Sequence, residues 1–516
     1  MNFAEVKGDL LAHGQERIAA SFICALAAIS GCAFLFARLI PGVDLPNHLA
    51  VATIVRYAGD MGNSFRDYFH VEAFLRPCIF HPTFCSLPIW PSVEFANRLL
   101  LTAYAVALPL TTGLIIRRAG GSMWLGLLSL LLIHNFNMSW GFVGFTMAIP
   151  VVLTIVYQLL GHLTSPSVRR ALTIGVLCLF LYTVHVLALL FALMLILAAG
   201  IAVFGVDWRR WRSLLLALLP SGLLIVWWWW QQPTYGQTTL HHLYGYYTQA
   251  FLKYLSLRPF ELLTLDNYFL FPGTRGMIVA AVSAGVIVLA VLIALLRNRR
   301  QVRQQAHRPY GRVLLAYLFV SLMCFALLPH KIPGEPYIYQ RFSVHVLLAV
   351  LLVAAYLIGR VTPVTIRLGA LACATISVIF WVGYVRDFNS KSSGFTAHVF
   401  DDLDPNMPVT AMVFDDAFRG EPLYMQFPNY YITWRHGIVT TSVADYRFSL
   451  VRRRVTRDVL PIYNPVIGRF PSTFDPSCLD VPYILTRGPC PVSLRPEINQ
   501  LRLVKRSGEW AIYASQ

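Results

Sequence analysis

Long apolar runs alternate with short basic loops over the first three quarters of the chain. Most runs are about 17–25 residues long, which is the length that a helix needs to cross a bilayer. About eleven such runs lie between Ile18 and Tyr384, so the pattern predicts a polytopic α-helical membrane protein. The predicted spans are 18–40, 96–116, 124–133, 144–160, two short spans sharing 171–204, 213–230, 277–296, 313–328, 342–358 and 368–384.

Arginine gives these spans an orientation. Its pairs and clusters fall in alternate loops, all on one predicted side, and cytoplasmic loops carry an excess of Lys and Arg. The segment before the first span has mixed charge, and the span is longer than the core of a signal peptide, so we expect an uncleaved helix. The basic segments are 117–118, 169–170, 209–212, 297–312 and 360–367. This predicts a cytoplasmic tail at residues 1–17 and a C-terminus on the opposite, outer side.

The chain is expected to have a membrane module at 18–386, including a long first outer loop at 41–95 with interfacial helices. From about residue 387 to 516 the sequence is polar, with short β-rich runs. Residues 501–505 and 510–513 flank Ser507-Gly508 and indicate a hairpin. We therefore expect a C-terminal outer α/β domain at 387–516.

Composition supports this class. Of 516 residues 57% are hydrophobic and only 13% are charged, which excludes a soluble multi-domain enzyme. The net charge is +17, but the basic clusters between the apolar runs lie in the predicted cytoplasmic loops, where such residues are expected in a membrane protein. No nucleic-acid partner is therefore expected. Four cysteines form two local pairs on the predicted outer side and are disulfide candidates: Cys78 with Cys85, and Cys478 with Cys490.

The most informative segment follows the first span and reads Asp44-Leu45-Pro46-Asn47-His48. Asp44 can cap a helix that begins at Leu45 and Pro46, and His48 four residues on can share its face. A carboxylate and an imidazole together can bind a metal or act as a general base. A capped interfacial helix with a surface histidine explains the same pattern.

Several other polar residues lie at predicted outer helix ends. Arg341 suits a phosphate group because its guanidinium donates in a fork, and His330 and Lys331 lie in the same loop. Snorkelling of Arg341 to the interface is the alternative. His134 and Asn135 begin a polar break at 134–141, and His185 lies between two short spans. These three can line a sugar pocket, or can be buried groups bonded to neighbouring helices.

An acidic residue at the start of the first outer loop, with eleven or so spans and an outer C-terminal domain, resembles the GT-C superfamily of membrane glycosyltransferases. The resemblance implies a bacterial inner-membrane hexosyl- or pentosyltransferase that takes sugar from a polyprenyl-phosphate donor at the periplasmic face. The acceptor would be a glycan, a lipid or a protein, and transfer would invert the anomeric centre. It also implies Asp44 as the catalytic base, with Asn47, His48 and the polar residues above binding substrate.

The sequence departs from the superfamily in one respect. Many members carry paired acidic residues, whereas Asp44 has no acidic neighbour. A divalent cation, Mg or Mn, held by Asp44 and His48 is therefore left open. Two other functions are also open: a transporter or flippase of a lipid-linked or small solute, and a non-catalytic membrane assembly protein.

Overall fold

The computed structural model describes residues 3–72, 76–231, 241–266, 304, 307–359, 362–441, 443, 449–466 and 474–515, with side chains from residue 14 onward. The chain divides into two compact units. The helical unit comprises Met1–Ala33, Leu101–Asn137 and Gly144–Val382. The mixed unit comprises Phe34–Leu100, Met138–Val143 and Gly383–Gln516. The domain limits at 18–386 and 387–516 stay a prediction.

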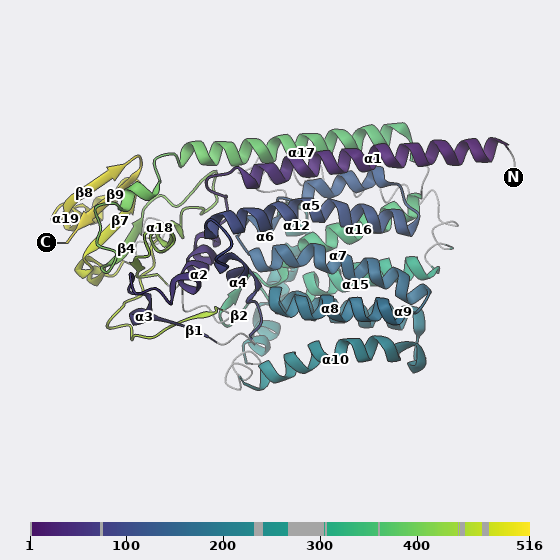
Figure 1. Cartoon of the computed structure of the whole chain (residues 1–516), viewed down its shortest axis with the longest axis horizontal. Helices are drawn as coiled ribbons and strands as arrows, with labels where there is room; N and C mark the ends of the chain where they lie inside the picture. Colours follow the sequence, from purple (N-terminus) through teal and green to yellow (C-terminus); the bar gives the residue numbers. More distant parts are fainter. Residues whose placement is uncertain are drawn as a thin grey trace. The chain divides into compact units, whose positions relative to one another are not determined.

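Long apolar helices build the helical unit (Figure 1). They and the shorter elements between them are α1 (Phe3–Leu35), α5 (Val93–Ala119), η1 (Met123–Leu132), α6 (Phe136–Ser139), α7 (Val143–Thr164), α8 (Val168–Val184), α9 (Val186–Phe204), α10 (Trp208–Trp230), η2 (Tyr246–Ala250), α12 (Phe251–Thr264), α15 (Pro309–Leu327), β2 (Lys331–Ile332), β3 (Glu335–Pro336), η3 (Tyr339–Phe342), α16 (Ser343–Ile358) and α17 (Val364–Lys391).

Within the described residues, eight helices are long and apolar enough to cross a membrane. They correspond to eight of the predicted spans: α1, α5, α7, α9, α10, α15, α16 with the preceding η3, and α17. Helix α8 is apolar but has 17 residues, and the predicted span at 124–133 is the ten-residue 3-10 helix η1. The predicted span at 277–296 lies outside the described residues. The predicted division of 171–204 is confirmed, because α8 ends at Val184 and α9 begins at Val186.

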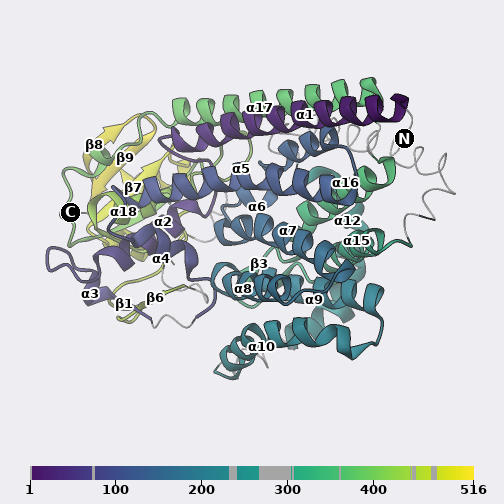
Figure 2. The ribbon, with the colours of Figure 1, turned by 45° about the vertical axis from the view of Figure 1, so that its right-hand side comes forward.

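Small residues allow close helix packing in this unit. Helix α8 packs against α10, and α9 packs against α15, which also contacts α16 (Figure 2). A Cβ on Gly175 of α8 would lie 2.4 Å from the Ala217 carbonyl of α10, and one on Gly200 of α9 would lie 2.2 Å from the Trp211 ring. In a membrane the hydrophobic effect does not drive helices together, so their association depends on close van der Waals packing at small residues such as these glycines.

The mixed unit combines short helices with a five-stranded sheet. Its elements are α2 (Leu45–Tyr57), α3 (Phe65–Tyr68), β1 (Phe69–Val71), α4 (Phe80–Ser86), η4 (Ala397–Phe400), β4 (Pro408–Val413), η5 (Phe427–Asn429), α18 (Tyr430–Arg435), β5 (Ile438–Val439), β6 (Val451–Arg453), η7 (Pro476–Asp480), β7 (Tyr483–Arg487), η8 (Val492–Leu494), α19 (Arg495–Ile498), β8 (Arg502–Ser507) and β9 (Trp510–Ala514).

The sheet has the strand order β5-β4-β7-β9-β8. Strand β4 is parallel to both neighbours, while β7, β9 and β8 pair antiparallel. Residues Val409–Val413 of β4 are all buried, which is typical of a central parallel strand. The β8–β9 hairpin confirms the predicted turn at Ser507-Gly508.

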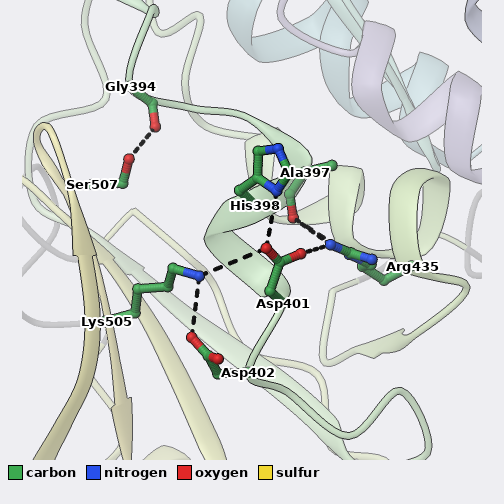
Figure 3. A network of polar contacts seen from close by, with 8 residues as sticks. All are labelled: Gly394, Ala397, His398, Asp401, Asp402, Arg435, Lys505 and Ser507. Atoms are coloured by element: carbon green, nitrogen blue, oxygen red, sulfur yellow. Dashed lines mark hydrogen bonds and ion pairs between the residues drawn. The ribbon is translucent and has the colours of Figure 1, made fainter.

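A polar network ties edge strand β8 to the segment before the sheet (Figure 3). Asp401 accepts from His398 Nδ1 at 2.9 Å and forms an ion pair with Arg435. Lys505 of β8 lies 3.1 Å from Asp402, and the Ser507 hydroxyl donates to the Gly394 carbonyl at 2.7 Å. Charged residues on this edge also oppose pairing with another chain.

Candidate functional site

Asp44 and His48 are half-buried residues at the start of a helix of the mixed unit whose first turns are otherwise buried. Helix α2 begins at Leu45, with Asp44 at the N-cap position and Pro46 in the first turn, as predicted. The prediction of a side-chain cap is wrong, because Asp44 makes no capping hydrogen bond. From residue 41 to 54 every residue is buried except Asp44 and His48, which are half-buried. Asn47 is buried.

A tight turn at Gly141 holds the backbone of Asp44. The Val43 and Asp44 amides donate to the carbonyls of Ser139 and Trp140, each at 3.0 Å. Gly141 has φ +75°, and a Cβ there would lie 2.7–2.8 Å from the backbone nitrogens of Leu45 and Asp44. Only glycine fits this turn without displacing the chain. The sequence flags it as part of the polar break, but not as the support of Asp44.

A second histidine lies beside His48. The rings of His48 and His81 are 5.6 Å apart in a T-shaped arrangement. His81 Nε2 is 2.9 Å from Asn97 Oδ1 and 3.5 Å from Cys85 Sγ. Burial lowers the pKa of His81 to about 4, so this imidazole is neutral at pH 7. Cys85 is therefore placed beside an imidazole, and its disulfide with Cys78 stays a prediction.

Two other carboxylates of this loop, Glu72 and Glu94, contact residues elsewhere. Glu72 pairs with Arg76 at 2.5 Å and with Arg452 at 3.2 Å. Glu94 accepts from the Trp434 indole at 2.7 Å. The described residues contain no group of three or more His, Cys, Asp and Glu side chains that could hold a metal. Metal dependence through Asp44 and His48 stays a prediction.

Arg341 is the centre of a buried polar cluster in the helical unit. It lies in η3, between the β2–β3 hairpin and α16, and is 3% exposed. Its Nη2 donates to Glu335 Oε2 at 3.2 Å and to the Pro336 carbonyl at 3.1 Å. Its Nη1 lies 3.1 Å from Nε2 of His185, the residue that separates α8 from α9. A buried Arg341 does not fit the alternative that this side chain snorkels to the interface. The contact also brings together Arg341 and His185, which were both predicted as site residues.

The polar break joins this cluster only in part. Asn137 donates to the Arg341 carbonyl at 3.0 Å. Asn135 instead donates to the Tyr104 hydroxyl at 2.7 Å, and His134 stacks on Trp381 with ring centres 4.7 Å apart. Asn137 is thus the residue of the break that lies next to Arg341.

His330 and Lys331 occupy different environments. His330 Nδ1 lies 2.6 Å from the side-chain nitrogen of Gln340, and its ring stacks on Tyr254 at 5.2 Å. Burial, together with the charge of Lys331, lowers the pKa of His330, so the ring is neutral at pH 7. Lys331 is exposed. His330 therefore supports the residue before Arg341, whereas Lys331 remains open to a ligand.

Two acidic residues of the helical unit were missed by the sequence reasoning. One is Glu335, the partner of Arg341. The other is Asp266, which is 1% exposed, accepts from the Phe136 amide at 2.9 Å and is hydrogen-bonded by Ser343. Burial raises its pKa to about 6. One indication of Asp266 was present in the sequence, because it is the single carboxylate of the apolar stretch at 262–271. An ionisable group in an apolar segment is costly and so often has a function.

No family model matches the sequence, and no curated protein sequence matches it. Among solved structures, the chain is similar to the crystal structure of ArnT from Cupriavidus metallidurans bound to undecaprenyl phosphate. The TM-score is 0.54 at 10% identity, and the match covers 96% of this chain and 98% of that chain.

The chain has an ArnT-like fold. This likeness confirms the predicted fold class: a polytopic helical membrane protein with a sheet-containing C-terminal part. The likeness extends over nearly the full length of both chains, so it covers both compact units and not the helices alone.

Proposed function

We propose that this protein is a GT-C glycosyltransferase that takes a sugar from a polyprenyl-phosphate carrier. The observation that carries the proposal is the full-length likeness to ArnT, whose crystal structure contains undecaprenyl phosphate. The proposal assigns one role within each unit: Arg341, buried in the helical unit, would bind the phosphate, and Asp44, half-buried in the mixed unit, would accept the proton.

The proposed reaction is a single displacement. The acceptor oxygen attacks C1 of the donor sugar, the bond between C1 and the phosphate oxygen breaks, and the acceptor proton passes to Asp44. The polyprenyl phosphate leaves with the bonding electron pair, and the configuration at C1 is inverted. Positioned proton transfer of this kind contributes roughly 10²–10⁴-fold in rate. His48, which is also half-buried, would orient the carboxylate or the acceptor.

Arg341 would stabilise the leaving phosphate. Its guanidinium is buried and fixed by Glu335 and Pro336, so little reorganisation is needed when charge develops on the phosphate. His185 Nε2 accepts from one of its terminal nitrogens at 3.1 Å and so helps to orient the guanidinium. Lys331, which is exposed, would attract the phosphate rather than hold it.

The partners and location follow as part of the proposal. The donor would carry a hexose or a pentose, and the acceptor would be a glycan, a lipid or a protein. The protein would lie in the bacterial inner membrane with its N-terminus in the cytoplasm and the C-terminal sheet in the periplasm. Asp44 and His48 would be the ligands of a Mg or Mn ion if the reaction uses one.

The test is cleavage and transfer of radiolabelled polyprenyl-phosphate sugars by purified protein in nanodiscs. Asp44→Asn should lose about 10²–10⁴-fold in turnover, and Arg341→Ala about 10²–10³-fold. Asp67→Asn and Arg209→Ala change matched exposed residues and should retain activity. The same assay with a metal chelator tests whether turnover requires a divalent cation. Equal turnover in wild type and Asp44→Asn would refute the role of Asp44, and binding of no lipid-linked sugar would refute the function.

A further inference from the structure

The C-terminal sheet carries a hollow of about 370 Å³ at one end of its parallel strands. Residues Phe414 and Asp415 follow β4, and Gly488 follows the parallel strand β7. In open sheets of this kind, ligands bind outside the carboxyl ends of parallel strands. The hollow therefore lies where this architecture most often places a ligand.

Both small and aromatic residues line the hollow. Thr486 and Ala511 are directly paired across β7 and β9, and both are buried. The side chains of Phe414 and Tyr513 are half-buried and line the same hollow. An aromatic lining of this kind suits a ligand with an apolar face that can stack on a ring.

Two carboxylates on the rim are fixed but remain open. Asp415 and Glu509 line the hollow and have side chains 45% and 46% exposed. Arg487, whose side chain is only 1% exposed, contacts Asp415 Oδ2 at 2.8 Å and also pairs with Glu509. Its guanidinium lies 3.6 Å from the centre of the Tyr424 ring. The buried cation holds both carboxylates in place without closing them off from solvent.

The charges around the hollow are nearly balanced. Asp415 and Glu509 are opposed by Arg487 and by Arg506, which also lines the hollow, while exposed Lys391 reaches Glu509 only at 3.9 Å. A strongly charged ligand would gain little from such a site. The two carboxylates can accept hydrogen bonds from the hydroxyl groups of a ligand. Together with the aromatic residues that line the hollow, they favour a neutral polyhydroxylated ligand.

We propose that this hollow is a binding site for one or two rings of a neutral saccharide. The pyranose face would stack on Tyr513 or Phe414, and its hydroxyl groups would donate to Asp415 and Glu509. The size is at the lower end of the usual range of small-molecule pockets, roughly 300–1,000 Å³. Its further role, holding the acceptor glycan during transfer, rests on the proposed glycosyltransferase function.

The binding test uses the full-length protein in nanodiscs and saturation-transfer NMR. The probes are neutral oligosaccharides of glucose, galactose, mannose and N-acetylglucosamine. Binding of at least one probe is expected, with affinity reduced about tenfold or more in Tyr513→Ala and in Asp415→Asn. Tyr483→Ala and Asp480→Asn are matched controls outside the hollow and should bind as wild type does. Thermal unfolding of each variant shows whether it is folded, and Phe414→Ala replaces any variant that is not.

Two outcomes overturn the proposal: no probe binds, or binding is unchanged in all folded hollow variants. The donor-cleavage assay separates this result from the proposed function. If the hollow binds saccharide but no lipid-linked sugar is cleaved, the glycosyltransferase proposal fails and the saccharide site stands. If cleavage occurs and the acceptor KM does not rise in folded Tyr513→Ala, the acceptor role fails.

Discussion

Replacing Gly141 with alanine tests whether the turn at 138–141 positions Asp44. Gly141 has φ +75°, a conformation that costs an L-residue about 1–2 kcal/mol. The added Cβ would also lie 2.7 Å from Leu45 N and 2.8 Å from Asp44 N. Both atoms belong to the backbone, so relief requires a shift of the helix start, and overpacking of this kind costs about 1–3 kcal/mol more.

Gly120 provides the matched control. It has φ +85°, but a Cβ there would have nothing within 4 Å. Gly120→Ala therefore carries the backbone strain without the contact. We expect it to destabilise the protein by about 1–2 kcal/mol, against about 2–5 kcal/mol for Gly141→Ala.

The decisive measurement pairs thermal unfolding with donor cleavage for both variants in nanodiscs. A displacement of about 1 Å at a catalytic group can cost roughly 100-fold in rate. Gly141→Ala should therefore lose about that much in kcat at a temperature where it is folded, and Gly120→Ala should keep wild-type kcat. Equal stability and equal kcat in the two variants would refute the reasoning, because the contact with Asp44 would then have no effect.

Three further predictions concern the carboxylates and cysteines. Glu335 holds Arg341 in position, so Glu335→Gln should bind undecaprenyl phosphate about tenfold more weakly in a titration. Tighter binding would mean that Glu335 mainly competes with the phosphate for Arg341. Burial raises the pKa of Asp266 from 3.8 to about 6, so the unfolded chain loses this proton at a lower pH than the native state does. The native state should therefore lose about 3 kcal/mol of stability as pH rises from below 4 through 6. Thermal unfolding of Asp266→Asn should not show this loss. Cys478 and Cys490 pack on one hydrophobic cluster, so mass spectrometry of protein from an oxidising compartment should find them linked; alkylation of both would contradict this.

The features that the sequence predicted well are those with a local cause. In the described residues, eight apolar runs of span length are helices, His185 separates α8 from α9, and the turn at Ser507-Gly508 joins β8 and β9 in a hairpin. In each case the residues that determine the element lie within that element or within a few residues of it. The position of Asp44 at the start of α2 belongs to the same class.

The features that were missed depend on residues far apart in the chain. Strand β1 pairs with β6, and Phe69 lies opposite Arg453, although each strand has only three residues. Arg487 appears in the sequence as a polar residue at a strand end, yet it is among the largest fully buried side chains. The partners that permit this burial, Asp415, Tyr424 and Glu509, are distributed over about 95 residues. Periodicity carries no information about such pairings.

The helix lengths around His185 favour an enzyme over a transporter. Transporters place discontinuous helices at the midplane of the bilayer. Helices α8 and α9 have 17 and 19 residues and so measure about 25 and 28 Å at 1.5 Å per residue, each close to the roughly 30 Å of a hydrocarbon core. His185 then lies at the end of two nearly complete spans and not in the middle of one. Arg341 lies 3.1 Å from His185, so we expect both residues near the end of these spans, as a site for a lipid phosphate requires and a midplane transport site does not.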